Sequence, residues 1–273
     1  MTLSWVDGQP ADGVSVRDRG LAFGDGLFET IKVVGGHPEL LDRHLHRLEF
    51  GCQRLAIACD IEVLREQLMA FSVQLVEGVA KLIVSRGEGR RGYAHPDPVR
   101  SRTIIFGSPL PCYPKAHAEQ GVYLYPCSTR LAEQPLLAGL KHLNRLEQVL
   151  ARAEWQDPAF AEGLMRDMSG RVIEGVFSNL FIVESGKLLT PLLERCGVAG
   201  VMREELLHRA KQAGVQTLIT DISLERLLDA DEVFVCNSLY GVWPVRQIET
   251  SDWSVGPLTR KLQRLVANLS SNT

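Results

Sequence analysis

The stretch from Gly139 to Arg152 reads GLKHLNRLEQVLAR, and the rest of the chain can be interpreted around it. From Leu143 onward, apolar residues recur every three or four positions, which predicts an amphipathic helix. Lys141 would then stand at the helix N-terminus, where the positive end of the helix dipole favours a neutral amine. A neutral lysine can form a Schiff base with an aldehyde. A solvated loop lysine is the ordinary alternative, so the remaining sequence has to decide.

The bulk composition is that of an ordinary globular protein. Of the 273 residues, 45% are hydrophobic and 23% are charged, and the net charge is -3 at pH 7. This balance gives no support for nucleic acid or an anionic membrane as a partner. The sequence contains neither a recognisable signal peptide nor an apolar run long enough to span a bilayer, so we expect a cytoplasmic protein.

The cysteines and histidines give no pattern of a metal site. The six cysteines have no C-x-x-C spacing, so we expect reduced thiols and neither a zinc site nor a disulfide framework. His44 and His46 are two positions apart and would point to different sides of a helix. We therefore predict no metal ion.

Apolar periodicity predicts two lobes of mixed strands and helices, an α/β (α+β) fold class. The first lobe would contain strands at 28–34, 80–85 and 103–106 and helices at 42–57 and 62–76, within a smaller α/β domain of residues 1–120. The second would begin with a strand at 122–125 and a loose segment at 128–139. Alternating strands and helices after the Leu143 helix would complete a larger α/β domain of residues 121–273, which would bind the cofactor.

A glycine- and arginine-rich loop follows the predicted strand at 80–85. Gly87, Gly89 and Gly92 have the spacing of a dinucleotide-binding loop, but they lead to Tyr93 and a proline instead of a helix, so that function is not predicted. Arg91 could bind a carboxylate in a bidentate fork, and Tyr93 could add a hydroxyl donor. A solvated loop is the alternative.

Two further stretches could hold a phosphate-bearing cofactor. Glu174 is followed by a glycine and a turn with amides and a hydroxyl, so the carboxylate could hold a ring nitrogen and the turn a phosphate. An ordinary hairpin would look similar. Residues 197–203 read GVAGVMR and place glycine-supported amides at a predicted helix N-terminus, where an anion is well accommodated.

Together these motifs resemble the fold type IV pyridoxal-phosphate enzymes, the group of branched-chain and D-amino-acid aminotransferases. The resemblance rests on Lys141 ahead of Asn144, the Glu174-Gly175 pair ahead of the sequence SNLF, and the sequence GVMR from Gly200. Within the group, residues 23–30, 85–93 and 141–150 are similar to the 4-amino-4-deoxychorismate lyases. The similarity runs from about Trp5 to about Val245. It implies two α/β lobes with the cofactor between them, and a homodimer.

The resemblance also implies which residues contact pyridoxal 5'-phosphate. Lys141 would bind the cofactor covalently, and Glu174 would face the pyridine nitrogen and keep it protonated. The phosphate would be bound by Arg47 and by amides and hydroxyls of Phe177, Ser178, Val201, Met202 and either Asn237 or Ser238.

For such a lyase the substrate would be 4-amino-4-deoxychorismate, and the products would be 4-aminobenzoate, on the way to folate, and pyruvate. Lys141 would remove the proton from the amine-bearing carbon, and Thr30 would be a second catalytic group. Phe28 would line the substrate pocket, and Arg91 and Tyr93 would bind a substrate carboxylate. The alternatives are a branched-chain or D-amino-acid aminotransferase, which uses the same lysine and cofactor, and a non-catalytic binding protein on the same scaffold.

Overall fold

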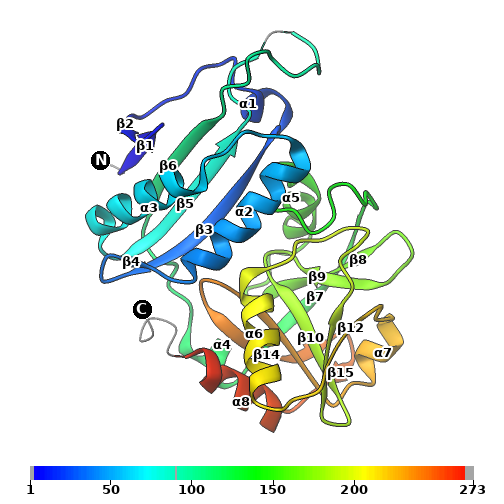
Figure 1. Ribbon diagram of the computed structural model, residues 1–273. Coiled ribbons are helices and arrows are strands. Elements are labelled where there is room, and N and C mark those ends of the chain that lie inside the picture. The colour runs from blue at the N-terminus through cyan, green and yellow to red at the C-terminus, as the bar shows by residue number, and fades with distance from the viewer. Residues whose placement is uncertain (1–2, 90, 268–273) are drawn as a thin grey trace. The chain divides into compact units, whose positions relative to one another are not determined.

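The computed structural model describes residues 3–89 and 91–267 (Figure 1). Contacts between Cα atoms divide these residues into two compact units. The first contains residues 3–111 together with the short segment Leu140–Asn144, and the second contains Cys112–Gly139 and the chain from Arg145 onward. Both units combine a sheet with helices, as the predicted fold class requires.

The first unit is a six-stranded antiparallel sheet with two helices on one face. The strand order is β2-β1-β6-β5-β3-β4. The strands are β1 (Ser4–Val6), β2 (Gln9–Pro10), β3 (Gly26–Val34), β4 (His37–Pro38), β5 (Gly78–Ser85) and β6 (Arg102–Ser108). The helices are α1 (Arg19–Phe23), α2 (Leu41–Leu55) and α3 (Ile61–Leu75), and Figure 1 shows α2 and α3 side by side over the sheet.

Strand β3 shows why the sheet has two different faces. Leu27, Ile31 and Val33 are buried and pack with α2 and α3 in one hydrophobic core. Successive side chains of a strand point to opposite faces, so Phe28 and Thr30 lie on the face away from these helices. The predicted strand at 28–34 and the two helices after it are confirmed, with the helix ends shifted by one or two residues.

The second unit contains a nine-stranded sheet in the order β12-β11-β10-β13-β14-β7-β8-β9, with β15 paired to β14. The strands from β10 to β9 in this order form a closed ring, because Asn179 of β10 pairs with Glu174 of β9. The strands are β7 (Val122–Leu131), β8 (Phe160–Asp167), β9 (Val172–Gly175), β10 (Asn179–Glu184), β11 (Lys187–Pro191), β12 (Thr217–Thr220), β13 (Glu232–Asn237), β14 (Gly241–Ile248) and β15 (Ser251–Asp252).

Five helices occur among the described residues of the second unit. They are α4 (Lys115–Glu119), α5 (Leu146–Arg152), α6 (Val201–Gln212), α7 (Leu224–Leu228) and α8 (Pro257–Val266). Helices α6 and α8 pack against each other and against β13, and α8 also contacts β14. Among the helices in the described ranges, none combines the length and apolar character that crossing a bilayer would need.

The division of the chain differs from the predicted boundary at residue 120 in two places. Helix α4, which the prediction assigned to the first domain, packs against β14 of the second unit, and Gln263 of α8 donates to the Ala118 carbonyl at 2.8 Å. The segment Leu140–Asn144, which the prediction assigned to the second domain, belongs to the first unit because its backbone pairs with β3.

Two sequence predictions about the central stretch were wrong. Part of the segment 128–139, predicted to be loose, is strand, because β7 continues to Leu131. The helix predicted from Leu143 begins at Leu146, because the residues before it lie extended beside β3. The Phe28 amide donates to the Lys141 carbonyl at 2.9 Å, and the Leu143 amide donates to the Gly26 carbonyl at 3.0 Å.

Candidate active site

Lys141 lies against the outer face of β3. Its Nζ atom is 4.3 Å from the centre of the Phe28 ring, and His142 forms a β-bridge with Leu27. Thr30 follows Phe28 on the same face of the strand. The structure therefore brings Lys141 together with Phe28. The argument from a helix dipole was wrong, since α5 begins only at Leu146 and the Lys141 carbonyl instead accepts the Phe28 amide of β3.

A second lysine on this face was missed by the sequence analysis. Lys81 of β5 is the cross-strand partner of Thr30, and its Nζ atom lies 5.0 Å from the Phe28 ring centre and 5.7 Å from that of Phe106. The sequence could have indicated Lys81, because it is a charged residue inside the apolar run at 80–85. The pairing register that puts it opposite Thr30 could not be read from the sequence.

On the other face of β3, Arg47 is held by the buried carboxylate of Glu29. The Arg47 Nε atom donates to Glu29 at 2.8 Å, Nη2 donates to the second oxygen, and His44 Nδ1 lies 2.6 Å from the same carboxylate. Burial alone would raise the pKa of Glu29, but the charge of Arg47 and the hydrogen bond with His44 outweigh it and lower the pKa to about 2. Arg47 thus has a fixed orientation on α2.

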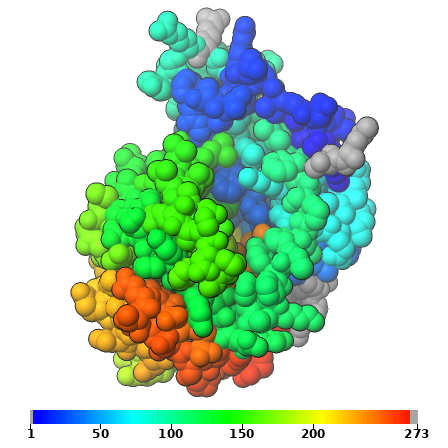
Figure 2. Space-filling view, turned by 180° about the vertical axis from the view of Figure 1, so that it is seen from behind, coloured from blue at the N-terminus to red at the C-terminus, as the bar shows by residue number. Residues whose placement is uncertain are grey.

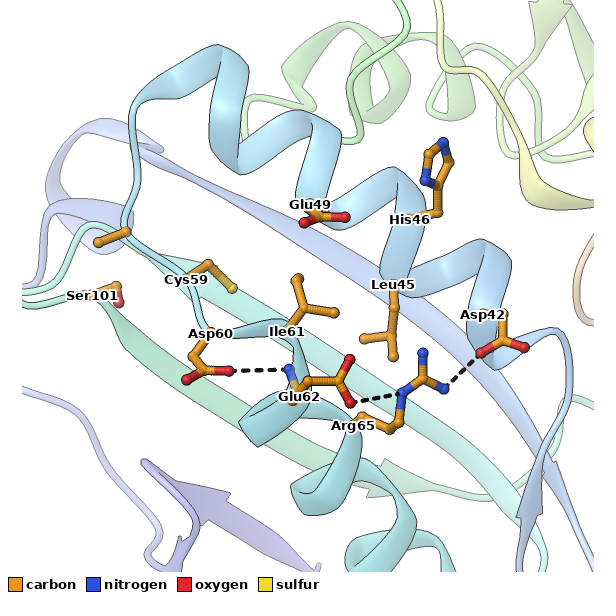
Figure 3. Close-up of a pocket in the computed structure, with 11 residues that line it drawn as sticks. Asp42, Leu45, His46, Glu49, Cys59, Asp60, Ile61, Glu62, Arg65 and Ser101 are labelled. Carbon is orange, nitrogen blue, oxygen red and sulfur yellow. Dashed lines mark hydrogen bonds and ion pairs between the residues drawn. The ribbon is translucent and has the colours of Figure 1, made fainter.

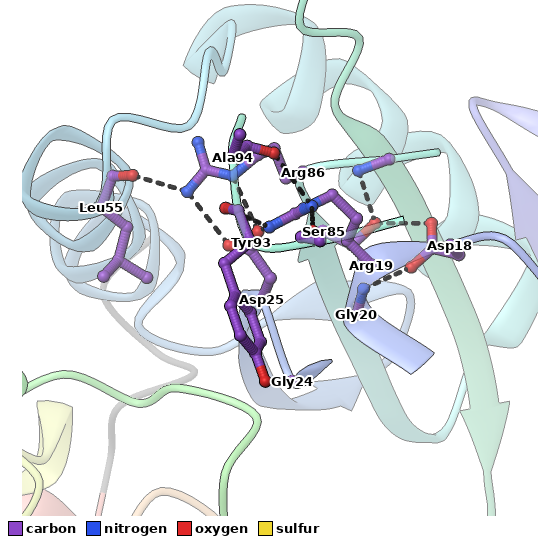
Figure 4. A network of polar contacts seen from close by, with 12 residues as sticks. Asp18, Arg19, Gly20, Gly24, Asp25, Leu55, Ser85, Arg86, Tyr93 and Ala94 are labelled. Carbon is purple, nitrogen blue, oxygen red and sulfur yellow. Dashed lines mark hydrogen bonds and ion pairs between the residues drawn. The ribbon is translucent and has the colours of Figure 1, made fainter. Parts of the chain in front are cut away.

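The glycine-rich loop after β5 is anchored by Arg19, which the sequence analysis did not single out (Figure 4). The Arg19 guanidinium donates to the carbonyls of Gly92, Tyr93 and Ala94 at 3.1 to 3.2 Å, and its Nε atom donates to Asp25 at 2.8 Å. The side chains of Arg91 and Tyr93 are themselves exposed, Tyr93 by 84%. The loop is therefore fixed at its backbone and presents these two side chains to solvent.

Asp25 is the centre of this network. Arg86 donates to both of its oxygens, at 2.8 and 3.0 Å, and also to the Leu55 and Ala56 carbonyls at the end of α2. Burial acts to raise the pKa of Asp25, but hydrogen bonds and charge from Arg86 and Arg19 lower it. The network ties the loop, α1 and α2 into one rigid corner of the first unit.

Glu174 holds the loop ahead of α6. Its carboxylate is buried and accepts the Val198 amide at 2.8 Å, while the Asn179 side chain donates to the Val198 carbonyl at 2.8 Å. Burial lowers the pKa of Arg145, and the charge of Glu174 acts in the opposite direction. The two stretches that the sequence analysis singled out separately, at Glu174 and at residues 197–203, therefore lie together.

The N-terminus of α6 offers backbone amides without a side-chain cap. The capping position is Gly200, and Val201 and Met202 in the first turn are buried. A Cβ atom on Gly200 would lie 2.0 Å from the Asn179 side-chain oxygen, so only glycine lets the turn approach this closely. The first amides of a helix have no intrahelical acceptor, which suits an anion such as a phosphate.

Residues 175–178 form a turn over the buried carboxylate of Glu162, which the sequence analysis did not identify. Ser178 Oγ lies 2.7 Å from Glu162 Oε2, and the Val176 amide donates to Oε1 at 2.9 Å. Phe177 is 42% exposed at the edge of this turn. A charged residue between the apolar pairs 160–161 and 164–165 of β8 was the available signal.

The last predicted pair lies at the end of β13. The Asn237 side-chain oxygen accepts the amides of Leu239 and Tyr240 at 2.9 and 3.0 Å, and its nitrogen donates to the Phe177 carbonyl at 3.3 Å. The carboxamide of Asn237 thus holds its own loop and the 175–178 turn together. Ser238 is half-buried next to it.

A surface hollow between α2 and α3 contains none of the predicted site residues (Figure 3). It is lined by charged side chains and Cys59, and Arg65 makes ion pairs with Asp42 at 2.6 Å and with Glu62 at 3.7 Å. We assign no function to it. Within the described part of the chain, no cluster of three metal-ligating side chains occurs.

Comparison with known protein families shows the family of this chain. Residues 26–248 match the family model described as amino-transferase class IV. The chain belongs to this family. Fold type IV, implied by the sequence resemblance, is confirmed by the match to a crystal structure of 4-amino-4-deoxychorismate lyase from Pseudomonas aeruginosa. That match has a TM-score of 0.96 and 62% identity over 97% of this chain and 98% of that one.

Two curated class IV relatives differ in the activity that their names state. An aminodeoxychorismate lyase of Vibrio harveyi is 40% identical over 267 residues, covering 96% of this chain and 98% of the relative. A putative branched-chain-amino-acid aminotransferase of Methanocaldococcus jannaschii is 31% identical over 261 residues, covering 92% of this chain and 88% of the relative. Higher identity and coverage therefore lie with the lyase.

Proposed function

We propose that this class IV chain is a pyridoxal-phosphate-dependent 4-amino-4-deoxychorismate lyase, which forms 4-aminobenzoate and pyruvate in the synthesis of folate. The observation that carries the proposal is the position of the Lys141 amine against Phe28 on the outer face of β3, beside Thr30. The named lyase relatives support it through their identity over nearly the whole chain. The cytoplasmic location stays a prediction.

The residues present fit the cofactor. Lys141 would bind it covalently, Glu174 would face its ring nitrogen, and the buried amides at the start of α6 suit its phosphate. Further phosphate contacts are proposed for Arg47, Phe177, Ser178, Val201, Met202 and either Asn237 or Ser238. When bound, this cofactor supplies an electron sink for the carbon that carries the substrate amine.

The chain's own groups would do the proton chemistry. The Lys141 amine is the proposed base that takes the proton from the amine-bearing carbon. The Thr30 hydroxyl, on the same face of β3, would orient the ether oxygen or deliver a proton to it as the carbon–oxygen bond breaks. The apolar ring of Phe28 would line the pocket beside the amine and exclude water. Arg91 and Tyr93 would bind a carboxylate of the substrate.

A homodimer is the proposed assembly, and the surface of α5 supports it. The helix was predicted to be amphipathic, and the structure leaves its apolar face open: Leu146 is 76% exposed, and Val149 and Leu150 are each 61% exposed. Leu136, in the segment before it, is 69% exposed. Figure 2 shows the chain around residues 120–160, in green, as a broad part of the visible surface. An exposed apolar patch of this kind marks an interaction site.

The decisive experiment has two parts. The purified protein is incubated with pyridoxal 5'-phosphate and reduced with borohydride, and the modified peptide is mapped, which should place the adduct on Lys141. Pyruvate release from 4-amino-4-deoxychorismate is then compared with amino transfer from D-alanine and from a branched-chain amino acid. Faster amino transfer than pyruvate release would favour the aminotransferase alternative, and absence of a borohydride-sensitive chromophore would favour a non-catalytic protein.

A further inference from the structure

The carboxylate of Glu162 lies directly beneath the 175–178 turn. It is fully buried, and its two oxygens are used differently. Oε1 accepts the amides of Gly163 and Val176 at 2.8 and 2.9 Å. Oε2 lies 2.7 Å from Ser178 Oγ, and the Phe177 amide approaches the same oxygen at 3.4 Å. One oxygen therefore holds the backbone of the turn, and the other faces the serine hydroxyl.

Gly175 shows how closely the turn rests on this carboxylate. A Cβ atom at this position would lie 2.2 Å from Ser178 Oγ and 2.8 Å from the Glu162 carboxyl carbon. Neither separation is possible for a real side chain, so the glycine is required by the contact between Glu162 and Ser178. The glycine of the Glu174-Gly175 pair thus allows the Ser178 hydroxyl to approach the Glu162 carboxylate.

The protonation state of Glu162 decides which way the Ser178 hydroxyl can point. An ionised carboxylate only accepts hydrogen bonds, so the serine proton must point inward and the hydroxyl offers only lone pairs to an outside anion. A protonated Glu162 can donate from Oε2 to Ser178 Oγ, which frees the serine proton for another acceptor, either Tyr240, whose side chain interacts with Ser178, or an outside anion. Oε1 accepts the Gly163 and Val176 amides in both states.

The surroundings of Glu162 keep a substantial fraction of it protonated near pH 7. Burial raises the pKa of Glu162 to about 7, although hydrogen bonds from Ser178 and from the backbone act to lower it. The titratable groups that face it are Tyr113, Tyr240 and Cys127, and burial raises the pKa of each one. All three are therefore neutral at this pH, and a nearby phosphate would be the dominant negative charge.

We propose that Glu162 is a positioning residue that makes Ser178 a hydrogen-bond donor to the cofactor phosphate when Glu162 carries a proton. The inference rests on the proposed function, because it takes the 175–178 turn as part of the phosphate site. It adds that binding of the phosphate is coupled to retention or uptake of one proton at Glu162. Affinity for the cofactor should then fall as pH rises through the range in which Glu162 ionises.

The test compares cofactor affinity in matched variants across pH 6 to pH 9. The dissociation constant of pyridoxal 5'-phosphate is measured from its release by the holoenzyme, followed by absorbance. In Glu162→Gln, the amide can donate to Ser178 and accept from Gly163 and Val176 at every pH. The cofactor and Lys141 titrate equally in both proteins, so the ratio of wild-type to variant dissociation constants isolates Glu162. We expect this ratio to rise by up to about tenfold per pH unit above pH 7.

Glu232 provides a matched control. It is a buried carboxylate of the same sheet that accepts the Leu258 and Thr259 amides at 3.0 and 2.7 Å and the Thr259 hydroxyl at 2.6 Å, at the far end of β13 from the turn. Glu232→Gln should keep the wild-type pH dependence of cofactor release. Ser178→Ala should weaken that dependence and reduce the difference made by Glu162→Gln, because only the direct repulsion between ionised Glu162 and the phosphate remains.

The outcomes separate this inference from the proposed function. The inference would be overturned if the dissociation constants of wild type and Glu162→Gln changed in parallel with pH. It would also be overturned if Glu162→Gln folded but bound the cofactor weakly at every pH. If Glu162→Gln does not fold, a Ser178→Ala curve flatter than wild type above pH 7 supports the inference, and an unchanged curve overturns it. A wild-type protein without a borohydride-sensitive chromophore would instead overturn the proposed function.

Discussion

The Nζ atom of Lys141 lies 4.3 Å from the centre of the Phe28 ring, because residues 141–143 pair with β3. These backbone hydrogen bonds to β3 fix the position of the Lys141 backbone. This relationship brings the proposed nucleophile to the face that also carries Thr30 and Lys81. Both neighbours should therefore affect pyruvate release.

Replacing Thr30 with valine should lower kcat for pyruvate release by about 10²-fold or more, the range expected for a lost proton-transfer group. Valine keeps the shape and the strand preference of threonine but has no hydroxyl. The absorbance of the bound cofactor should stay unchanged, because Lys141 is not altered. Thr30→Ser is the matched control and should keep most of the activity. An unchanged kcat in Thr30→Val would remove Thr30 from the mechanism.

Replacing Lys81 with methionine should raise KM more than it lowers kcat. The Lys81 ammonium is the cross-strand neighbour of Thr30 and lies over Phe28, so it can attract a carboxylate of the substrate. A hydrogen bond to a charged group contributes about 1.5–3 kcal/mol, which corresponds to a KM increase of roughly tenfold or more. Lys187→Met removes the same charge from the exposed first residue of β11 and should change neither constant. A loss confined to kcat would contradict this role.

Glu29 should make the first unit sensitive to acid. Its pKa falls from 4.5 to about 2 on folding, so its stabilising contribution is complete above pH 4.5 and is lost as pH falls toward 2. The shift corresponds to roughly 3 kcal/mol at neutral pH. Glu29→Gln, which removes the ionised carboxylate that Arg47 and His44 contact, should therefore lower the free energy of unfolding at pH 7.

Urea titrations at pH 7 and at steps down to pH 2.5 would check this prediction. The difference between wild type and Glu29→Gln should narrow as the pH falls below 4.5, because the wild type loses the contribution that the variant already lacks. A difference that is constant over the whole range would mean that Glu29 contributes by packing and not by charge. Glu66→Gln, at an exposed position of α3, should leave the free energy of unfolding nearly unchanged at every pH.

How much the sequence predicted depends on the range of the interactions involved. β3, α2 and α3 were predicted because their apolar residues alternate or recur within a few positions. The extended backbone at Lys141 was missed, since it depends on a partner strand far away in the sequence. The exposed face of α5 was missed as well, because periodicity shows that a helix has an apolar face but not what covers it.

In the candidate site too, local motifs were predictable from the sequence and contacts between distant residues were not. Motifs with glycine at fixed spacing indicated the two turns, at 175–178 and at 197–200, because a close approach leaves no other residue possible. Glu162 and Arg19, which hold a turn and a loop from beneath, each bind groups distant in sequence. Nothing local distinguishes such a residue from an exposed charge. Only the strongly apolar sequence around Glu162 hinted at burial.

The glycine-rich loop gives the last prediction, which concerns Arg19. Its guanidinium binds three successive carbonyls of the loop and one oxygen of Asp25, so it fixes the backbone that carries Arg91 and Tyr93. Arg19→Leu should release this backbone while Arg86 still binds Asp25. The KM for the substrate should then rise, and chymotrypsin should cut after the exposed Tyr93 faster than in wild type. Arg91→Ala, the matched control, should raise KM without faster cleavage, because it removes the proposed carboxylate ligand and leaves the anchor intact. Faster cleavage in Arg19→Leu with an unchanged KM would show that the loop is anchored but does not bind substrate.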